Sequence, residues 1–199
     1  MIRIDMHLHT TRYSACARMS AERLVQISRD LPVHAVVITE HDVLWPREEL
    51  EELQSQTDGQ FRFFRAVEVS TDVGHILAYN LSEESDITVG MPLAKLARIA
   101  REEGAALVMA HPGRFTAAVP EPPSEAWQQI AAVEVMSNNI HVSQIPVVRQ
   151  AVGALNKPMV ANSDAHDEEI VGLYATEFPR MPEDEAELAR MLIDGSCIP

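Results

Sequence analysis

Short apolar runs alternate with helix-like segments along this chain, and that alternation restricts its fold more than any other feature. Most of the runs are continuously apolar, as expected for strands of a parallel sheet that are buried on both faces. Strands joined in turn by helical segments favour a barrel. Seven strands are predicted, beginning near Arg3, Ala35, Arg62, His75, Ala105, Val133 and Pro158, and an eighth is expected within residues 173–178.

Capping and helix-breaking residues mark the ends of the intervening helices. Ser20 is a suitable N-cap, and Pro46 can open a helix because the first turn does not need its missing N–H. Gly104 can end a helix in a left-handed conformation. The predicted helices span residues 21–29, 46–54, 93–103, 124–130, 145–155 and 183–194. The proline-rich stretch 119–124 is interpreted as a long active-site loop.

Length and charge limit the remaining possibilities. The 199 residues, 46% of them hydrophobic, predict one domain over residues 1–199, and a full eightfold barrel usually needs about 250 residues. We therefore expect a compact barrel with short helices or a missing unit. The net charge of −14 argues against nonspecific nucleic-acid binding and against attachment to membranes. Because the sequence shows no signal peptide, we expect a cytoplasmic protein, and its two distant cysteines predict neither a disulfide scaffold nor a zinc ribbon.

Six of the eight histidines stand at the ends of apolar runs, usually beside a carboxylate. His7 and His9 are two residues apart on a predicted strand, so both imidazoles can face one ion. Asp164 and His166 repeat this spacing. Burying so many imidazoles and acids without a cation would leave many uncompensated polar groups, and the sequence therefore predicts a metal site. The predicted ligands are His7, His9, His41, Glu68, His75, His111, Asp164 and His166.

These residues lie in motifs that occur in a fixed order along the chain. The motifs are Asp5-Met6-His7-Leu8-His9-Thr10, Ile38-Thr39-Glu40-His41-Asp42, Val67-Glu68-Val69, His75-Ile76-Leu77, Ala110-His111-Pro112 and Asn162-Ser163-Asp164-Ala165-His166. The ordered set extends over nearly the whole chain and resembles the PHP family, which is named for polymerase and histidinol phosphatase. The resemblance implies a distorted (β/α)7 TIM-like barrel that holds two or three divalent ions of zinc, manganese or iron. In many members of the family such a site hydrolyses phosphoesters.

The resemblance also implies how the ligands are shared among the ions. The first ion would be held by His7, His9, Glu68 and Asp164, the second by Glu68, His75 and His111, and His41 and His166 would begin a third site. Where relatives with a complete third site supply Asp or His, this chain has Cys16 nearby. Its thiolate is either a third-site ligand or inert. Glu40 replaces a common Asp and is expected to orient its neighbours rather than to bind metal.

Adjacent ions suit phosphoester hydrolysis, because two cations about 3.5–4 Å apart can share a hydroxide that attacks phosphorus. Nearby arginines would neutralise the developing charge, and Arg114 is preferred for this role over Arg12 and Arg18. Glu134 is expected either to orient a ligand or to contact substrate. If the third ion is missing, a proton for the leaving group would come from His166 or Asp42. The residues predicted to take part in catalysis are Glu68, Asp164, His166 and Arg114.

Together these features predict a metal-dependent phosphoesterase, a phosphoric ester hydrolase, that acts on a small phosphorylated metabolite or nucleotide. The loop 113–125 is the expected selector of the substrate. One alternative is an amidohydrolase-like C–N or C–O hydrolase, although neither Lys95 nor Lys157 suits a carbamylated-lysine ligand. The other is a non-catalytic metal-binding module that docks to a larger assembly. His34 and His141 are interpreted as structural or noncatalytic residues.

Overall fold

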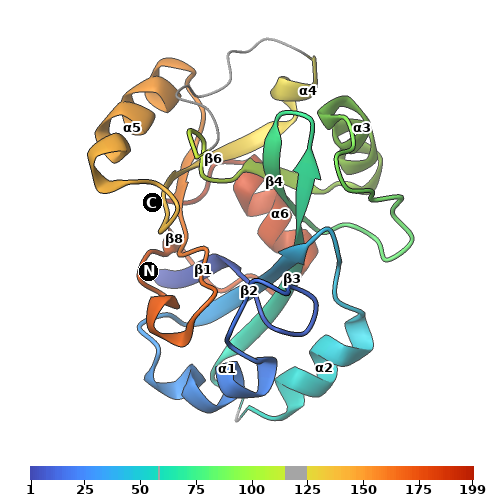
Figure 1. Ribbon diagram of the computed structural model, residues 1–199, viewed down its shortest axis with the longest axis vertical. Coiled ribbons are helices and arrows are strands. Elements are labelled where there is room, and N and C mark those ends of the chain that lie inside the picture. Colours follow the sequence, from blue (N-terminus) through green and yellow to red (C-terminus); the bar gives the residue numbers. More distant parts are fainter. Residues whose placement is uncertain (58, 115–124) are drawn as a thin grey trace.

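Eight strands wrap into a nearly closed barrel in the computed structural model, which describes residues 1–57, 59–114 and 125–199 (Figure 1). Neighbouring strands follow the order β7-β6-β5-β4-β3-β2-β1-β8. A parallel bridge between Leu8 and Ala165 joins β1 to the segment after β7 and narrows the remaining seam. The strands are β1 (Ile2–Leu8), β2 (Ala35–His41), β3 (Arg62–Thr71), β4 (Gly74–Tyr79), β5 (Ala106–Met109), β6 (Ile130–Met136), β7 (Met159–Ala161) and β8 (Thr176–Phe178). The distorted TIM-like barrel predicted from the sequence is thus confirmed.

Two strands run against the parallel direction that the apolar pattern predicts. β4 is antiparallel to both β3 and β5, and β8 is antiparallel to β1. Only residues 72 and 73 separate β3 from β4, whereas a parallel pair needs a crossover of a dozen or more residues. The first residues of β4 therefore lie at the same end of the barrel as the last residues of the parallel strands. His75 reaches the site from the start of its strand.

The helices largely follow the segments expected from the sequence. Ser20 accepts a hydrogen bond of 3.1 Å from Arg23 N, and Gly104 ends its helix at φ 68°. The helix predicted over 124–130 is shorter, because Ile130 already pairs with β5 as the first residue of β6. The helices are α1 (Ala21–Ile27), α2 (Arg47–Ser55), α3 (Leu93–Glu103), α4 (Glu125–Gln128), α5 (Ile145–Ala154) and α6 (Glu185–Ile193), with 3-10 turns at Ser28–Asp30, Val142–Gln144 and Glu168–Ile170.

The C-terminal helix α6 packs against the barrel strands β3 to β6, and Figure 1 shows it behind the strands at the centre of the view. Its buried side chains share one apolar cluster with residues from all eight strands. Within this cluster the Tyr79 hydroxyl donates a 2.9 Å hydrogen bond to the backbone oxygen of Met6. α1 and α2 cover one part of the barrel's outside, and α3, α4 and α5 cover another. The residues predicted to bind metal lie at the polar end of the barrel.

Two expectations from the sequence concern a segment that lies largely outside the described residues. The proline-rich stretch 119–124 and most of the proposed selector loop 113–125 lie outside the described residues. Within the described part of the chain, no helix has the length and apolar character needed to cross a membrane.

Candidate metal centre

The side chains predicted to bind metal converge at one end of the barrel, although they come from segments spread over most of the sequence. Their ligand atoms form three overlapping groups, and within each group all the atoms lie within 4.8 Å of one another. These groups are His7, His9, Glu68 and Asp164; His41, Glu68 and His75; and His9, His41 and His166. His111 is close to the same carboxylates. Its Nε2 lies 3.0 Å from Glu68 Oε1 and 3.6 Å from Asp164 Oδ2.

Glu68 occupies the middle of the cluster, and imidazoles face both of its oxygens. Oε2 lies 2.9 Å from His41 Nδ1 and 3.1 Å from His9 Nε2. Oε1 lies 2.8 Å from His75 Nδ1 and 3.0 Å from His111 Nε2. A carboxylate with imidazoles beside both of its oxygens is suited to bridge two cations.

Asp164 lies beside the paired histidines of β1. Its Oδ1 is 3.3 Å from His7 Nε2 and 3.2 Å from His9 Nε2, and these two nitrogens are 3.2 Å apart. The backbone of Asp164 is left-handed, with φ 53°, a strained conformation for a residue other than glycine. The neighbouring Ser163 donates its backbone N–H to Asp5 Oδ1 at 2.9 Å. Asp5, fully buried behind the cluster, thereby supports the turn that presents Asp164.

The electrostatics of the cluster favour cations. Glu68 and Asp164 are 0% and 1% exposed, yet within the described residues no hydrogen bond reaches Glu68 Oε2 or Asp164 Oδ1. Burial opposes the ionisation of Glu68, but His7 and the neighbouring imidazoles outweigh it and hold the pKa of Glu68 well below its usual range. Burial likewise opposes charge on His7, and Asp164 and Glu68 raise the pKa of His7 well above its usual value. Ionised buried acids grouped with several imidazoles are the donor set that divalent metal ions need.

Glu134 stands behind the ligands rather than in the open mouth. Its Oε1 lies 3.2 Å from His7 Nδ1 and accepts a 2.9 Å hydrogen bond from Asn162 Nδ2. Its Oε2 accepts a 2.8 Å hydrogen bond from the backbone N–H of His111. Glu134 is fully buried, so the structure favours the orienting role over substrate contact.

The loop after β1 presents a serine, rather than the cysteine, to the cluster. Ser14 Oγ lies 3.3 Å from His9 Nδ1 and accepts a 3.2 Å hydrogen bond from His41 N. Cys16 is exposed and belongs to none of the three ligand groups. Glu40 also stays outside these groups, and its carboxylate accepts a 3.0 Å hydrogen bond from Trp45 Nε1. Sequence reasoning does not reveal the position of Ser14 at the cluster, because serines are common in polar loops.

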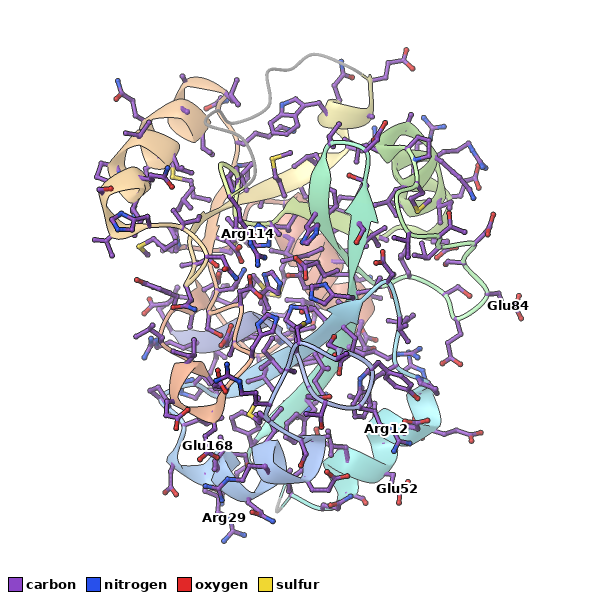
Figure 2. All side chains as sticks on the ribbon, in the orientation of Figure 1. Arg12, Arg29, Glu52, Glu84, Arg114 and Glu168 are labelled. Carbon is purple, nitrogen blue, oxygen red and sulfur yellow. The ribbon has the colours of Figure 1, made fainter. Side chains whose placement is uncertain are left out.

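The three arginines considered for substrate binding lie in different places, and Figure 2 labels Arg12 and Arg114. The Arg12 side chain lies beside α2, where its Nη2 is 3.0 Å from Glu49 Oε2. The Arg18 side chain is 81% exposed and lies 3.5 Å from Asp167. Only Arg114 approaches the ligand cluster, with its Nη1 3.9 Å from Asp164 Oδ2. It also lines a cleft of about 280 Å³ together with His75 and His111.

Most other polar residues singled out in the sequence have partners outside the cluster. Asp42 accepts hydrogen bonds from Ser70 N and Oγ, at 2.7 and 2.8 Å, whereas the proton-donor role proposed for it needs a substrate contact. His34 Nδ1 accepts a 3.1 Å hydrogen bond from Arg3 N. The remaining contacts are His141 with Ser143, Lys95 with Asp86, and Lys157 with the backbone oxygen of Ile130. His166 does lie at the cluster, with Nδ1 3.6 Å from Asp164 Oδ1.

A TIM-like barrel with a histidine and carboxylate cluster at its mouth defines the chain as a candidate metal-binding protein of the α/β-barrel class. Comparisons with known proteins indicate which family of this class the chain resembles. A family model described as PHP-associated matches residues 147–197. No curated protein matches the sequence. This match covers about a quarter of the chain and, together with the ordered motifs, supports the resemblance to the PHP family.

Similar solved structures show the same fold. PsfC from Pseudomonas syringae has a TM-score of 0.69 at 18% identity, over 95% of this chain and 88% of PsfC. A two-domain protein from Bacteroides vulgatus, described as containing a predicted PHP-like metal-dependent phosphoesterase, has a TM-score of 0.68 at 19% identity over 98% of this chain. This chain spans 63% of that protein's length. An amidohydrolase from Chromobacterium violaceum has a TM-score of 0.65 at 13% identity, over 98% of this chain and 97% of that one.

Proposed function

We propose that this protein is a metal-dependent phosphoesterase that hydrolyses a small phosphorylated metabolite or nucleotide. The observation that carries the proposal is the environment of Glu68, a fully buried carboxylate with imidazoles facing both oxygens. This arrangement supports two adjacent cations that share Glu68. The first would also use His7, His9 and Asp164, and the second would use His75 with His111 or His41.

Two adjacent divalent ions would activate a water molecule and offset the charge that develops on a phosphoryl group during in-line displacement. The side chains around them have separate tasks. Arg114, at the edge of the cleft, would bind a non-bridging phosphoryl oxygen. Glu134 would keep the His7 ring fixed with Nε2 directed toward Glu68 and Asp164.

His166 is the better placed of the two residues considered as proton donors. Its ring lies at the mouth near Asp164, and it is only partly buried. Burial, together with the charge of His9, lowers the pKa of His166. At neutral pH a lowered pKa favours the uncharged imidazole, so His166 would first accept a proton from water and then return it to the leaving oxygen. Asp42 is already bonded to Ser70 and is disfavoured for this role.

The test is hydrolysis by purified protein that has been stripped of metal and reloaded with manganese, zinc or iron. p-Nitrophenyl phosphate, bis-p-nitrophenyl phosphate, p-nitroacetanilide and a lactone form the substrate panel. We expect release of p-nitrophenol from at least one phosphate ester, and loss of that activity in Glu68→Gln. Glu84→Gln is the matched control, because Glu84 is an exposed residue away from the cluster (Figure 2).

Two outcomes would contradict the proposal. Hydrolysis of the amide or lactone, with the phosphate esters left intact, would favour an amidohydrolase-like enzyme. Tight metal binding without hydrolysis of any substrate under any loading would instead favour the metal-binding module. Co-purification with one stoichiometric large partner would strengthen that second conclusion.

A further inference from the structure

We propose that Asn139 is a positioning residue of this metal centre, which leaves Asp164 Oδ1 for a metal ion by occupying Oδ2. The proposal rests on the metal centre inferred above and extends it to a side chain outside the three ligand groups. Asn139 lies in the loop between β6 and the 3-10 turn Val142–Gln144. Nothing in the sequence pattern distinguishes it from its neighbour Asn138.

The two oxygens of Asp164 have different surroundings. Oδ2 accepts a hydrogen bond from Asn139 Nδ2. Oδ1 is buried, and among the described residues no hydrogen bond reaches it, while His7 and His9 Nε2 lie 3.3 and 3.2 Å away. A carboxylate that is held through one oxygen can bind an ion through the other alone. The Asn139 amide therefore selects monodentate coordination by Asp164.

Backbone hydrogen bonds hold the Asn139 amide in place. Asn138 N donates to Ser163 O at 3.2 Å, which ties the loop to the segment that carries Asp164. Asn139 N donates to Ser137 Oγ at 3.3 Å. The next residue, Ile140, is 3% exposed and anchors the loop in the apolar layer beneath α5. These contacts bring the amide to Asp164 without requiring a bound ligand.

Arg114 lies near the same carboxylate oxygen, with Nη1 3.9 Å from Asp164 Oδ2. His111 Nε2 lies closer to this oxygen, at 3.6 Å, but it faces Glu68 Oε1 at 3.0 Å. In the absence of Asn139, the Arg114 guanidinium is therefore the cation placed to replace the lost donor. A closer pair between Arg114 and Asp164 would draw the arginine from the cleft where it is proposed to bind a phosphoryl oxygen. Asn139 thus affects both the metal ion and the approach of substrate.

The test compares Asn139→Ala with Asn138→Ala, which removes an exposed amide from the same loop and keeps the backbone hydrogen bond to Ser163. Metal affinity is measured by competition between the metal-free protein and a chromogenic zinc chelator. We expect Asn139→Ala to weaken zinc binding about 10- to 100-fold, the usual effect of removing an outer partner of a ligand. Asn138→Ala should retain wild-type affinity. The visible spectrum of the cobalt-loaded protein should change in Asn139→Ala only.

Asn139→Gln keeps the amide donor and covers the case in which the alanine variant fails to fold. It should recover part of the lost affinity and the wild-type cobalt spectrum. Equal affinity and identical cobalt spectra in wild type and Asn139→Ala would overturn the proposal, as would equal losses in the two alanine variants. If the folded wild-type protein binds no metal, both the proposed function and the proposed role of Asn139 fail. Metal binding without phosphoester hydrolysis defeats the proposed function alone, since the affinities still decide the role of Asn139.

Discussion

Replacing Glu134 by glutamine tests whether the buried layer behind the ligands controls metal binding. One carboxylate oxygen contacts His7 Nδ1 and Asn162 Nδ2, and the other accepts a hydrogen bond from the backbone N–H of His111. Glutamine has a single amide oxygen, so its NH2 group must face at least one of these donors. A buried donor that loses its acceptor costs about 1–3 kcal/mol. At about 2–4 °C per kcal/mol for a chain of this size, the melting temperature of the metal-free protein falls by roughly 2–12 °C.

The same substitution should weaken metal binding about 10- to 100-fold, because the His7 ring loses the acceptor that orients it. Thermal unfolding followed by circular dichroism gives the melting temperature, and competition with a chromogenic zinc chelator gives the metal affinity. Glu84→Gln removes one exposed carboxylate and should change neither. If Glu134→Gln matches Glu84→Gln in both measurements, Glu134 does not support the ligands and the reasoning fails.

Burial opposes charge on His7, but nearby carboxylates raise its pKa well above 6.5, so the metal-free protein holds a proton there at neutral pH. Metal binding must displace that proton, and affinity falls as the pH is lowered; calorimetric enthalpies that do not depend on buffer ionisation would contradict this. Arg114→Ala should raise KM for a phosphate ester roughly 10- to 100-fold in steady-state assays, whereas similar KM values for Arg114→Ala and Arg12→Ala would remove Arg114 from substrate binding. Burial raises the pKa of Cys197 to about 11, so at pH 8 only about one molecule in a thousand carries its thiolate. Ellman's reagent should therefore label the exposed Cys16 in the native protein and Cys197 only after unfolding, and rapid labelling of both thiols would refute the assignment.

The sequence predicts the order of strands and helices because each apolar run must be buried and each helix carries its own end signals. It does not reveal the direction of β4. An apolar pattern is the same in either direction, and only the short connection between Thr71 and Gly74 requires a hairpin. Direction decides which end of β4 reaches the site, and here it is the end that carries His75.

The candidate metal ligands are recognisable from the sequence because imidazoles and acids at the ends of buried strands are costly unless they have charged or polar partners. Their supporting residues are harder to identify. Ser14 and Asn139 are ordinary loop residues, and their roles depend on hydrogen bonds to parts of the chain distant in sequence. The sequence favours Arg114 over Arg12, although each follows a predicted ligand histidine by three residues. Only the folded chain pairs Arg12 with Glu49 and places Arg114 near Asp164.

Anomalous diffraction from crystals grown with manganese or zinc tests whether metal ions bind at Glu68, because it locates ions without relying on activity. We predict at least two peaks, one on each side of the Glu68 carboxylate, with zinc–ligand distances of about 2.0–2.2 Å to carboxylate oxygens and imidazole nitrogens. His7, His9 and Asp164 should surround one peak, and His75 should lie beside the other. Crystals of metal-loaded protein with no peak at Glu68, or with peaks confined to other parts of the surface, would show that this cluster is not the metal site.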